Sequence, residues 1–163
     1  MNKQLVLVNI EELKDIQAPA FGLEILREVL LPDILGSDHP QMLYWAGKGL
    51  ARRYPVQSIE EISVFFEAAG WGNLTLLQNK KNEMEFELGG ELIAIRLKKT
   101  NECTFQLEAG FIAEQLQSMN KYITETYEQV KKRSNKVIFT AQWDQKDQIL
   151  EEPSIGKRRA RKG

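Results

Sequence analysis

The sequence contains very little of the chemistry that most catalytic and metal sites require. It has one cysteine, Cys103, and one histidine, His39. A single cysteine excludes an intramolecular disulfide and a cysteine-rich metal motif, and a zinc site needs several ligands at suitable spacing. Nothing in the sequence places His39 beside Cys103, so no nucleophile–histidine arrangement is indicated. We therefore expect no catalytic residue, no metal and no cofactor, and favour a solvated or capping role for His39.

A long apolar run is also missing. The N-terminus has a short apolar patch, Leu5 to Val8, which acidic residues soon follow. This segment is too short for a membrane span or a signal peptide, and the single cysteine fits a reducing compartment. We therefore expect a soluble, cytoplasmic protein, and 163 residues suffice for one domain with a substantial core.

The charge is unevenly distributed along the chain. Five of the 22 basic residues lie in the last seven positions, so residues 1–156 hold the other 17 against 23 acidic residues. An acidic body is a poor binder of phosphate backbones, and no aromatic residue interleaves with the basic ones. We expect a single domain over 1–144, a polar and then basic disordered tail over 145–163, and no nucleic-acid partner.

The first 70 residues predict helices. Apolar residues recur three and four positions apart over 20–31, and Pro32 is expected to end this helix. A second helix is expected over about 39–54. A third opens at the capping box Ser58-Ile59-Glu60-Glu61 and ends at Gly70, where a left-handed residue is placed without strain.

Glycines inside the second helix need a separate explanation. Gly47 and Gly49 each cost about 1 kcal/mol relative to alanine, which indicates that something lies close to the backbone. We favour a neighbouring helix over a ligand. Gly110 similarly interrupts a later apolar helix.

The stretch 65–76, which contains Gly70-Trp71-Gly72, marks the change from helix to strand. Alternating polar and apolar residues predict strands over 74–78, 83–88 and 92–97. In the third strand, Arg96 is expected to pair across the sheet with glutamates of the second strand.

The last part of the domain predicts one helix and a hairpin. The helix runs from Phe105 to about Asn120, and Glu108 on its apolar stripe is interpreted as a partly exposed rim residue. Residues 122–130 mix strand and helix signals, and we favour a strand that pairs with 137–143. The fold class is α+β, with N-terminal helices packed on an antiparallel sheet of about five strands and one further helix inserted before the final hairpin.

Three motifs resemble the YslB-type family of uncharacterised bacterial proteins. They are the helix Gly-Lys-Gly-Leu-Ala-Arg-Arg at 47–53, the corner Phe-Glu-Ala-Ala-Gly-Trp-Gly at 66–72 and the helix Leu-Glu-Ala-Gly-Phe at 107–111. More distantly, they are similar to vinyl-reductase-like ligand-binding domains and to TRAPP small subunits. This resemblance implies an α+β fold, and among the distant relatives either apolar ligand binding or dimeric interaction. Neither an axial haem histidine nor an acylated cysteine carries over, because His39 and Cys103 are not at matching positions.

These observations favour a non-catalytic binding domain for a small apolar ligand. Helix glycines and aromatic residues in the region of resemblance could line a cavity, although aromatic residues at helical spacing are more often core. The alternative is a homodimeric adaptor or scaffold with no small-molecule ligand, and an enzyme is less favoured than either. The candidate ligand-binding residues are Trp45, Gly49, Phe66, Trp71 and Phe111.

Overall fold

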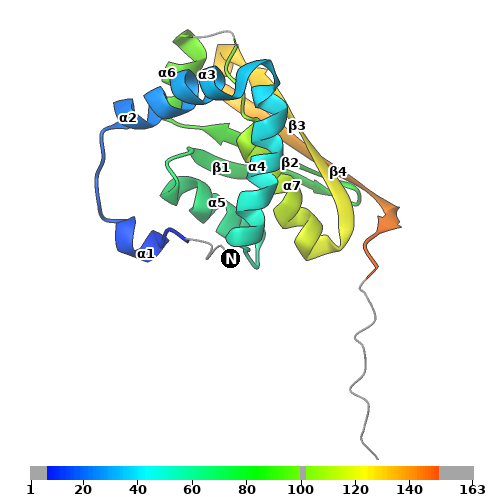
Figure 1. Ribbon diagram of the computed structural model, residues 1–163. Coiled ribbons are helices and arrows are strands. Elements are labelled where there is room, and N and C mark those ends of the chain that lie inside the picture. The colour runs from blue at the N-terminus through cyan, green and yellow to red at the C-terminus, as the bar shows by residue number, and fades with distance from the viewer. Residues whose placement is uncertain (1–6, 100–101, 151–163) are drawn as a thin grey trace, which may run out of the picture.

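The computed structural model describes residues 7–99 and 102–150. Helices occupy most of the first half (Figure 1): α1 (Ile10–Leu13), α2 (Ala20–Glu24), the π-helix η1 (Ile25–Leu30), α3 (Leu31–Leu35), the 3-10 turn η2 (Gly36–Asp38), α4 (His39–Arg53) and α5 (Ile59–Ala68). Two hairpins and two helices follow: β1 (Asn73–Lys80), β2 (Glu83–Gly89), α6 (Glu91–Lys99), α7 (Gln106–Asn120), β3 (Tyr122–Lys131), the 3-10 turn η3 (Lys132–Ser134) and β4 (Lys136–Gln148). This order confirms the α+β class.

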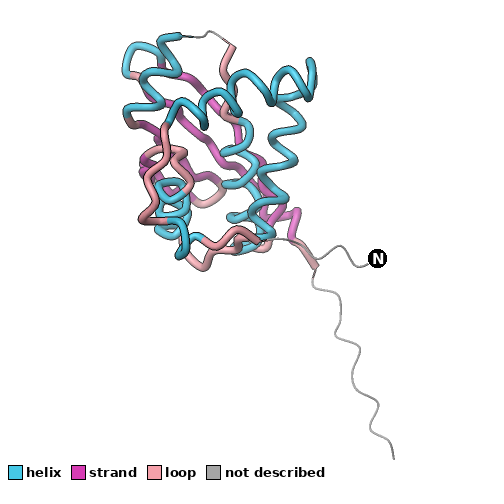
Figure 2. Tube along the Cα trace, turned by 60° about the vertical axis from the view of Figure 1, so that its left-hand side comes forward, coloured by secondary structure: helices cyan, strands magenta, loops and turns pink. Residues whose placement is uncertain are grey.

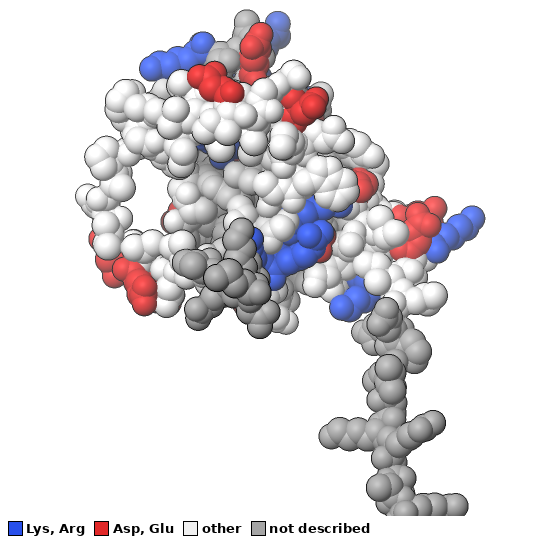
Figure 3. All heavy atoms as spheres, viewed as in Figure 1, with Lys and Arg blue, Asp and Glu red and all other residues white. Residues whose placement is uncertain are grey.

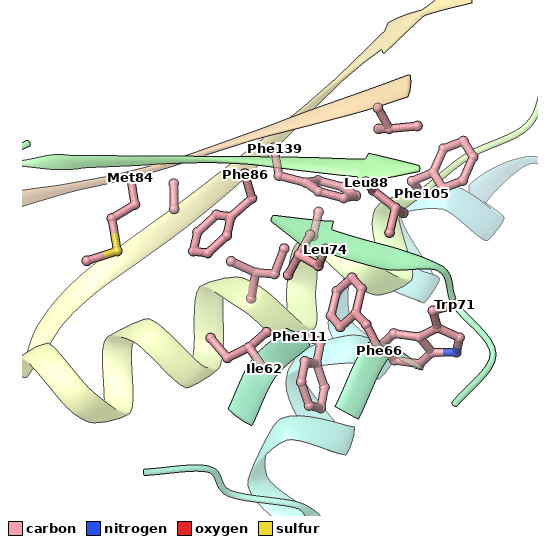
Figure 4. Packing of buried hydrophobic residues seen from close by; sticks show 14 of the residues in the cluster. Ile62, Phe66, Trp71, Leu74, Met84, Phe86, Leu88, Phe105, Phe111 and Phe139 are labelled. Atoms are coloured by element: carbon pink, nitrogen blue, oxygen red, sulfur yellow. The ribbon is translucent and has the colours of Figure 1, made fainter. Parts of the chain in front are cut away.

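The strands form one antiparallel sheet in the order β1-β2-β4-β3, and they run side by side as one layer (Figure 2). The final hairpin is confirmed, because β3 pairs with β4 from Lys131 and Lys136 onward. One face of the sheet carries alternating apolar side chains, among them Phe86 and Phe139, which pack with residues of α5 and α7 in a single core (Figure 4).

The prediction of a strand over 92–97 was wrong, and the described sheet has four strands rather than about five. This segment is α6, which follows directly after Gly90, whose carbonyl accepts from Ala94 N–H at 3.0 Å. Ile93 and Leu97 are buried, whereas Ile95 is exposed. Apolar residues four positions apart fit both a strand and a helix, so the alternation at 93, 95 and 97 was ambiguous.

Pro32 does not end the first long helix, contrary to expectation. The chain continues helically from α2 through η1 into α3, with Pro32 near the start of α3. In η1 the bonds span five residues, as between Leu31 N–H and the Leu26 carbonyl. The wider π-helical turn relieves the contact of the proline ring with the carbonyl four residues before it.

Two glycines let α4 and α7 cross with their backbones in contact. A Cβ on Gly47 would lie 2.0 Å from the Leu107 carbonyl oxygen, and one on Gly110 would lie 2.0 Å from the Tyr44 carbonyl oxygen. The neighbouring-helix interpretation is therefore confirmed for Gly47. It does not extend to Gly49, which faces open space.

The corner after α5 is built as the sequence indicates. Ser58 Oγ accepts from Glu61 N–H at the start of α5. At its end Gly70 has φ +69°, Gly70 N–H donates to the Glu67 carbonyl, and Trp71 N–H donates to the Phe66 carbonyl. This pair of bonds is the Schellman arrangement, and it turns the chain directly into β1.

The final strand extends past the expected C-terminal end of the domain. β4 continues to Gln148, four residues past 144, where the domain was expected to end. Residues 151–163 of the expected tail lie outside the described residues, as do residues 5 and 6 of the apolar patch 5–8. Within the described ranges, no helix combines the length and the apolar character needed to cross a membrane.

Candidate functional site

Three of the five candidate ligand-binding residues lie together in the core. The rings of Phe66, Trp71 and Phe111 have centroids 5.1 to 6.1 Å apart, mostly edge to face, and Phe65 stacks on Phe111 at 4.4 Å. Phe66 and Phe111 are fully buried, and Trp71 is nearly so (Figure 4). These side chains pack against one another, so their shared role in the structure is to hold α5, α7 and the corner together.

The other two candidates lie apart from this cluster. Gly49 faces open space, and Trp45 is 59% exposed beside the Lys48 ammonium, which lies 5.3 Å from its ring centroid. Trp45 borders an open hollow beside the edge strand β3. The five residues therefore do not share a cavity, and contact of any of them with a ligand stays a prediction.

A polar cluster that the sequence did not indicate forms the floor of that hollow. Tyr44 Oη donates to Glu125 Oε2 at 2.5 Å and accepts from Thr126 N–H at 3.2 Å. Burial and the hydrogen bond to Glu125 raise the pKa of Tyr44 above its usual range. Lys48 Nζ lies 3.7 Å from the Glu125 carboxylate. These contacts satisfy an outward amide of the edge strand, which would otherwise be open to strand pairing.

A pocket of about 410 Å³ lies between the N-terminal helices and α6. We call α2, η1, α3 and α6 together the helical cap. Apolar and charged residues both line the pocket. Its lining residues are Phe21, Glu24, Ile25, Glu28, Val29, Pro32, His39, Ile95, Arg96, Lys99 and Glu102.

Arg96 forms ion pairs with other charged residues of the pocket. Its side chain is almost fully buried, and its Nε and Nη2 donate to the two Glu24 carboxylate oxygens at 3.1 and 2.5 Å. Glu28 Oε1 lies 3.3 Å from the same Nε. These partners come from α2 and η1, so the expected cross-strand pairing of Arg96 was wrong because residues 92–97 are helical. The remaining nitrogen, Nη1, is buried and has no hydrogen-bond partner among the described residues.

A second ion pair links the helical cap to α7. Arg27 Nη2 lies 2.5 Å from Glu108 Oε1, although their alignment is not that of a hydrogen bond. Glu108 is fully buried, so its interpretation as a rim residue was wrong. Its burial raises the pKa of this carboxyl, and the Arg27 guanidinium opposes that rise. Both Arg27 and Arg96 have guanidinium carbons within 6 Å of the Phe105 ring centroid, a cation–π arrangement.

The histidine and the cysteine of the chain both lie in the region of the pocket. His39 borders the pocket. Burial raises the pKa of the half-buried Cys103 thiol, with the nearby Glu28 charge adding to the rise, which disfavours the nucleophilic thiolate. In the part of the chain that the structure describes, no three His, Cys, Asp or Glu side chains are grouped to hold a metal ion.

Sequence reasoning missed the pocket because its polar residues look solvated in isolation. Arg96 lies between the buried residues Ile93 and Leu97, and Arg27 lies in the apolar stretch of η1. An arginine on the buried side of a helix is the signal that could have been noticed. The partners could not be identified, because Glu24 and Arg96 are 72 positions apart.

The comparisons with known proteins agree with this architecture. The chain belongs to a family described as a protein of unknown function (DUF2507), whose model matches residues 20–142. It is 56% identical over 141 residues to the uncharacterised protein YslB of Bacillus subtilis (strain 168), covering 86% of this chain and 95% of that protein. The expected resemblance to YslB is thus confirmed.

Two solved structures share the fold. One is a vinyl-4-reductase family protein from Methanocaldococcus jannaschii, with a TM-score of 0.60 and 23% identity over 83% of this chain and 86% of that one. The other is the phenol-responsive sensory domain of the transcription activator PoxR with phenol, with a TM-score of 0.55 and 15% identity over 78% of this chain and 76% of that one. Identities this low show the fold alone.

Proposed function

We propose that this protein is a non-catalytic binding domain that holds a small, largely apolar molecule in the pocket beneath the helical cap. The observation that carries the proposal is the pocket itself, about 410 Å³, whose lining combines apolar residues with a buried arginine. Ligand sites in proteins are of this size, mostly apolar, and contain a few fixed polar groups.

The charged residues of the pocket limit the chemical class of ligand that it can bind. The lining holds three carboxylates, Glu24, Glu28 and Glu102, against two cations, Arg96 and Lys99. The first two carboxylates already pair with the Arg96 guanidinium, so an anionic ligand would enter a pocket whose lining charge is net negative. The Arg96 Nη1 group still has N–H donors without a hydrogen-bond partner among the described residues. A neutral molecule with an apolar body and one acceptor, such as a ketone oxygen, adds no charge, and its acceptor bonds Nη1 when a small shift of the Arg96 side chain exposes this buried group.

The fold gives supporting but weaker information. The PoxR domain with a similar fold holds phenol, a small aromatic molecule with one polar group. That molecule combines an apolar body with one polar group, as the proposed ligand does. Because function does not follow from fold, the proposal depends on the pocket of this chain.

The test compares the affinity of the pocket for two small probes of matched size. Saturation-transfer NMR with the full chain measures the binding of acetophenone and ethylbenzene, which differ by a ketone oxygen. We expect both to bind, with acetophenone bound about fivefold more tightly because of one additional hydrogen bond.

A tryptophan at Ile95, which borders the pocket, should weaken both probes about tenfold or more by occupying it. The matched control is Leu77→Trp on β1, because Leu77 is 45% exposed and Ile95 is 43% exposed. If Ile95→Trp and the control bind the probes equally well, the pocket is not the site.

A second candidate function, a homodimeric adaptor, rests on the exposed apolar residues of the same helices. Phe21 and Ile34 are each 75% exposed, and Leu26 and Val29 are about half exposed. Apolar surface of this kind is typical of protein contacts. Light scattering would detect the dimer, and Ile34→Asp should dissociate it. A monomer at every concentration would eliminate this candidate.

A further inference from the structure

The N-terminal arm, residues 7–14, is attached to the body through one side chain of α4's C-terminal cap. The hydroxyl of Tyr54 accepts from Val8 N–H at 2.9 Å and donates to the Val8 carbonyl at 2.8 Å. A single hydroxyl thus satisfies both main-chain groups of Val8. This attachment fixes the position of the arm beside α5.

The arm lies in an apolar groove that it fills only in part. The walls of the groove are Tyr54, Val56, Val64, Phe65 and Ala68, and hollows of about 740 and 260 Å³ remain beside the arm. Leu7 and Val8 are each 56% exposed even though they lie in the groove. The arm therefore contacts the walls of the groove without filling the groove.

The connection between the arm and the body is held weakly. We call residues 15–19 the link. All five are exposed, and they form an arch with an opening between it and the body (Figure 3). The link ends at Pro19, whose extended backbone leads into α2. The family match begins only at residue 20, so the arm and the link precede the shared domain.

We propose that the arm of one copy docks in the groove of a second copy, so that two chains form a dimer by exchanging arms. The chain's own arm already occupies this groove, so the arm and the groove fit each other. The same contacts with Tyr54 and Phe65 are available between chains, and the link forms no buried contact that exchange would break. This inference is independent of the ligand pocket and of the apolar surface on the helical cap.

The test mixes two different copies of the full chain, each in a Cys103→Ser background. One copy carries Leu13→Cys in the arm, and the other carries Ala69→Cys in the groove, because both residues border the same hollow. After equilibration, a short bismaleimide should join the two copies about tenfold more than it joins the arm copy to a Tyr127→Cys control. Tyr127 is an exposed residue of β3, at the opposite edge of the sheet from β1.

One chain that carries both Leu13→Cys and Ala69→Cys measures docking within a copy. Internal cross-linking of this chain, with inter-copy cross-linking no higher than the control, would overturn the proposal. A separate variant without Gln17 and Ala18 shortens the link, and its dimer fraction in light scattering should rise about tenfold.

A dimer formed through the helical cap would behave differently. It would dissociate in Ile34→Asp and would not respond to link length, whereas an arm-exchanged dimer would show the opposite pattern. If the short-link variant stays monomeric by light scattering at every concentration, arm exchange is excluded.

Discussion

The core and the helical cap are stabilised by different physical means. In the core, Phe66, Trp71 and Phe111 pack ring against ring, and Gly47 allows two helix backbones to touch. In the cap, buried arginines are neutralised by glutamates, and large apolar residues such as Phe21 remain exposed. Close packing gives the first region one arrangement, whereas the second retains a pocket.

This difference locates the candidate site. An empty volume in a close-packed aromatic core costs stability. The Arg96 ion pairs fix α6 against α2 without filling the space between them. We infer that the charged cluster keeps the pocket open.

The largest expected effect is in the core. Phe111→Ala removes a fully buried ring that contacts three other aromatic rings, and we expect it to lower the free energy of unfolding by about 4 kcal/mol. Urea denaturation measures this change. Trp45→Ala, on the exposed face of α4, is the control and should cost less than about 1 kcal/mol. Similar losses in both variants would contradict the description of the core.

In the helical cap, breaking the Arg27–Glu108 ion pair with α7 should lower the free energy of unfolding nearly as much. Arg27→Met leaves the fully buried Glu108 without its partner, and we expect a loss of about 3 kcal/mol at neutral pH. The double variant Arg27→Met, Glu108→Gln should recover most of that loss, because it leaves no buried charge. Urea denaturation of the three variants gives the coupling energy. A double variant as unstable as Arg27→Met would argue for lost packing instead.

Replacing the two glycines of α4 by alanine should change stability in opposite directions. Gly47→Ala places a methyl group against the backbone of α7, and we expect it to cost about 2 kcal/mol or more. Gly49→Ala faces open space and should stabilise the protein by about 0.5–1 kcal/mol, since alanine favours helix. Thermal unfolding of both variants checks the pair. Equal effects of the two substitutions would contradict the close crossing of α4 and α7.

The elements with local signals could be predicted from the sequence, and the contacts between distant segments could not. Ser58 and Gly70 marked the ends of α5, because capping depends on neighbouring residues. The alternation at 93, 95 and 97 did not distinguish a helix from a strand at Arg96. Its partner Glu24 could not be identified, because it is 72 positions away. Three of the four aromatic candidates, Phe66, Trp71 and Phe111, lie in the core, whereas Trp45 is exposed. The pocket was missed because its polar residues are of types typical of surfaces.

A smaller effect is expected in the pH dependence of stability. Burial raises the folded-state pKa of Glu108 above its ordinary value of 4.5. Between the unfolded and folded pKa values the folded state therefore binds more protons, so stability falls as pH rises through that interval. Relative to Glu108→Gln, the wild type should lose stability as the pH is raised above 4.5. Urea denaturation across this range measures the difference, and a wild type that gains stability instead would show that Arg27 dominates.

The smallest effect on stability is expected for Phe21→Ala in the helical cap, which should weaken ligand binding without destabilising the fold. Phe21 borders the pocket and is 75% exposed, so Phe21→Ala should change the free energy of unfolding by less than about 0.5 kcal/mol. It removes part of the apolar wall, however, and should weaken acetophenone binding about fivefold. Ile34 is equally exposed but does not border the pocket, so Ile34→Ala should change neither quantity. Because the two residues are matched in exposure, a loss of binding in Phe21→Ala alone would assign the apolar wall to ligand binding. Equal binding by both variants would show that Phe21 does not contact the ligand.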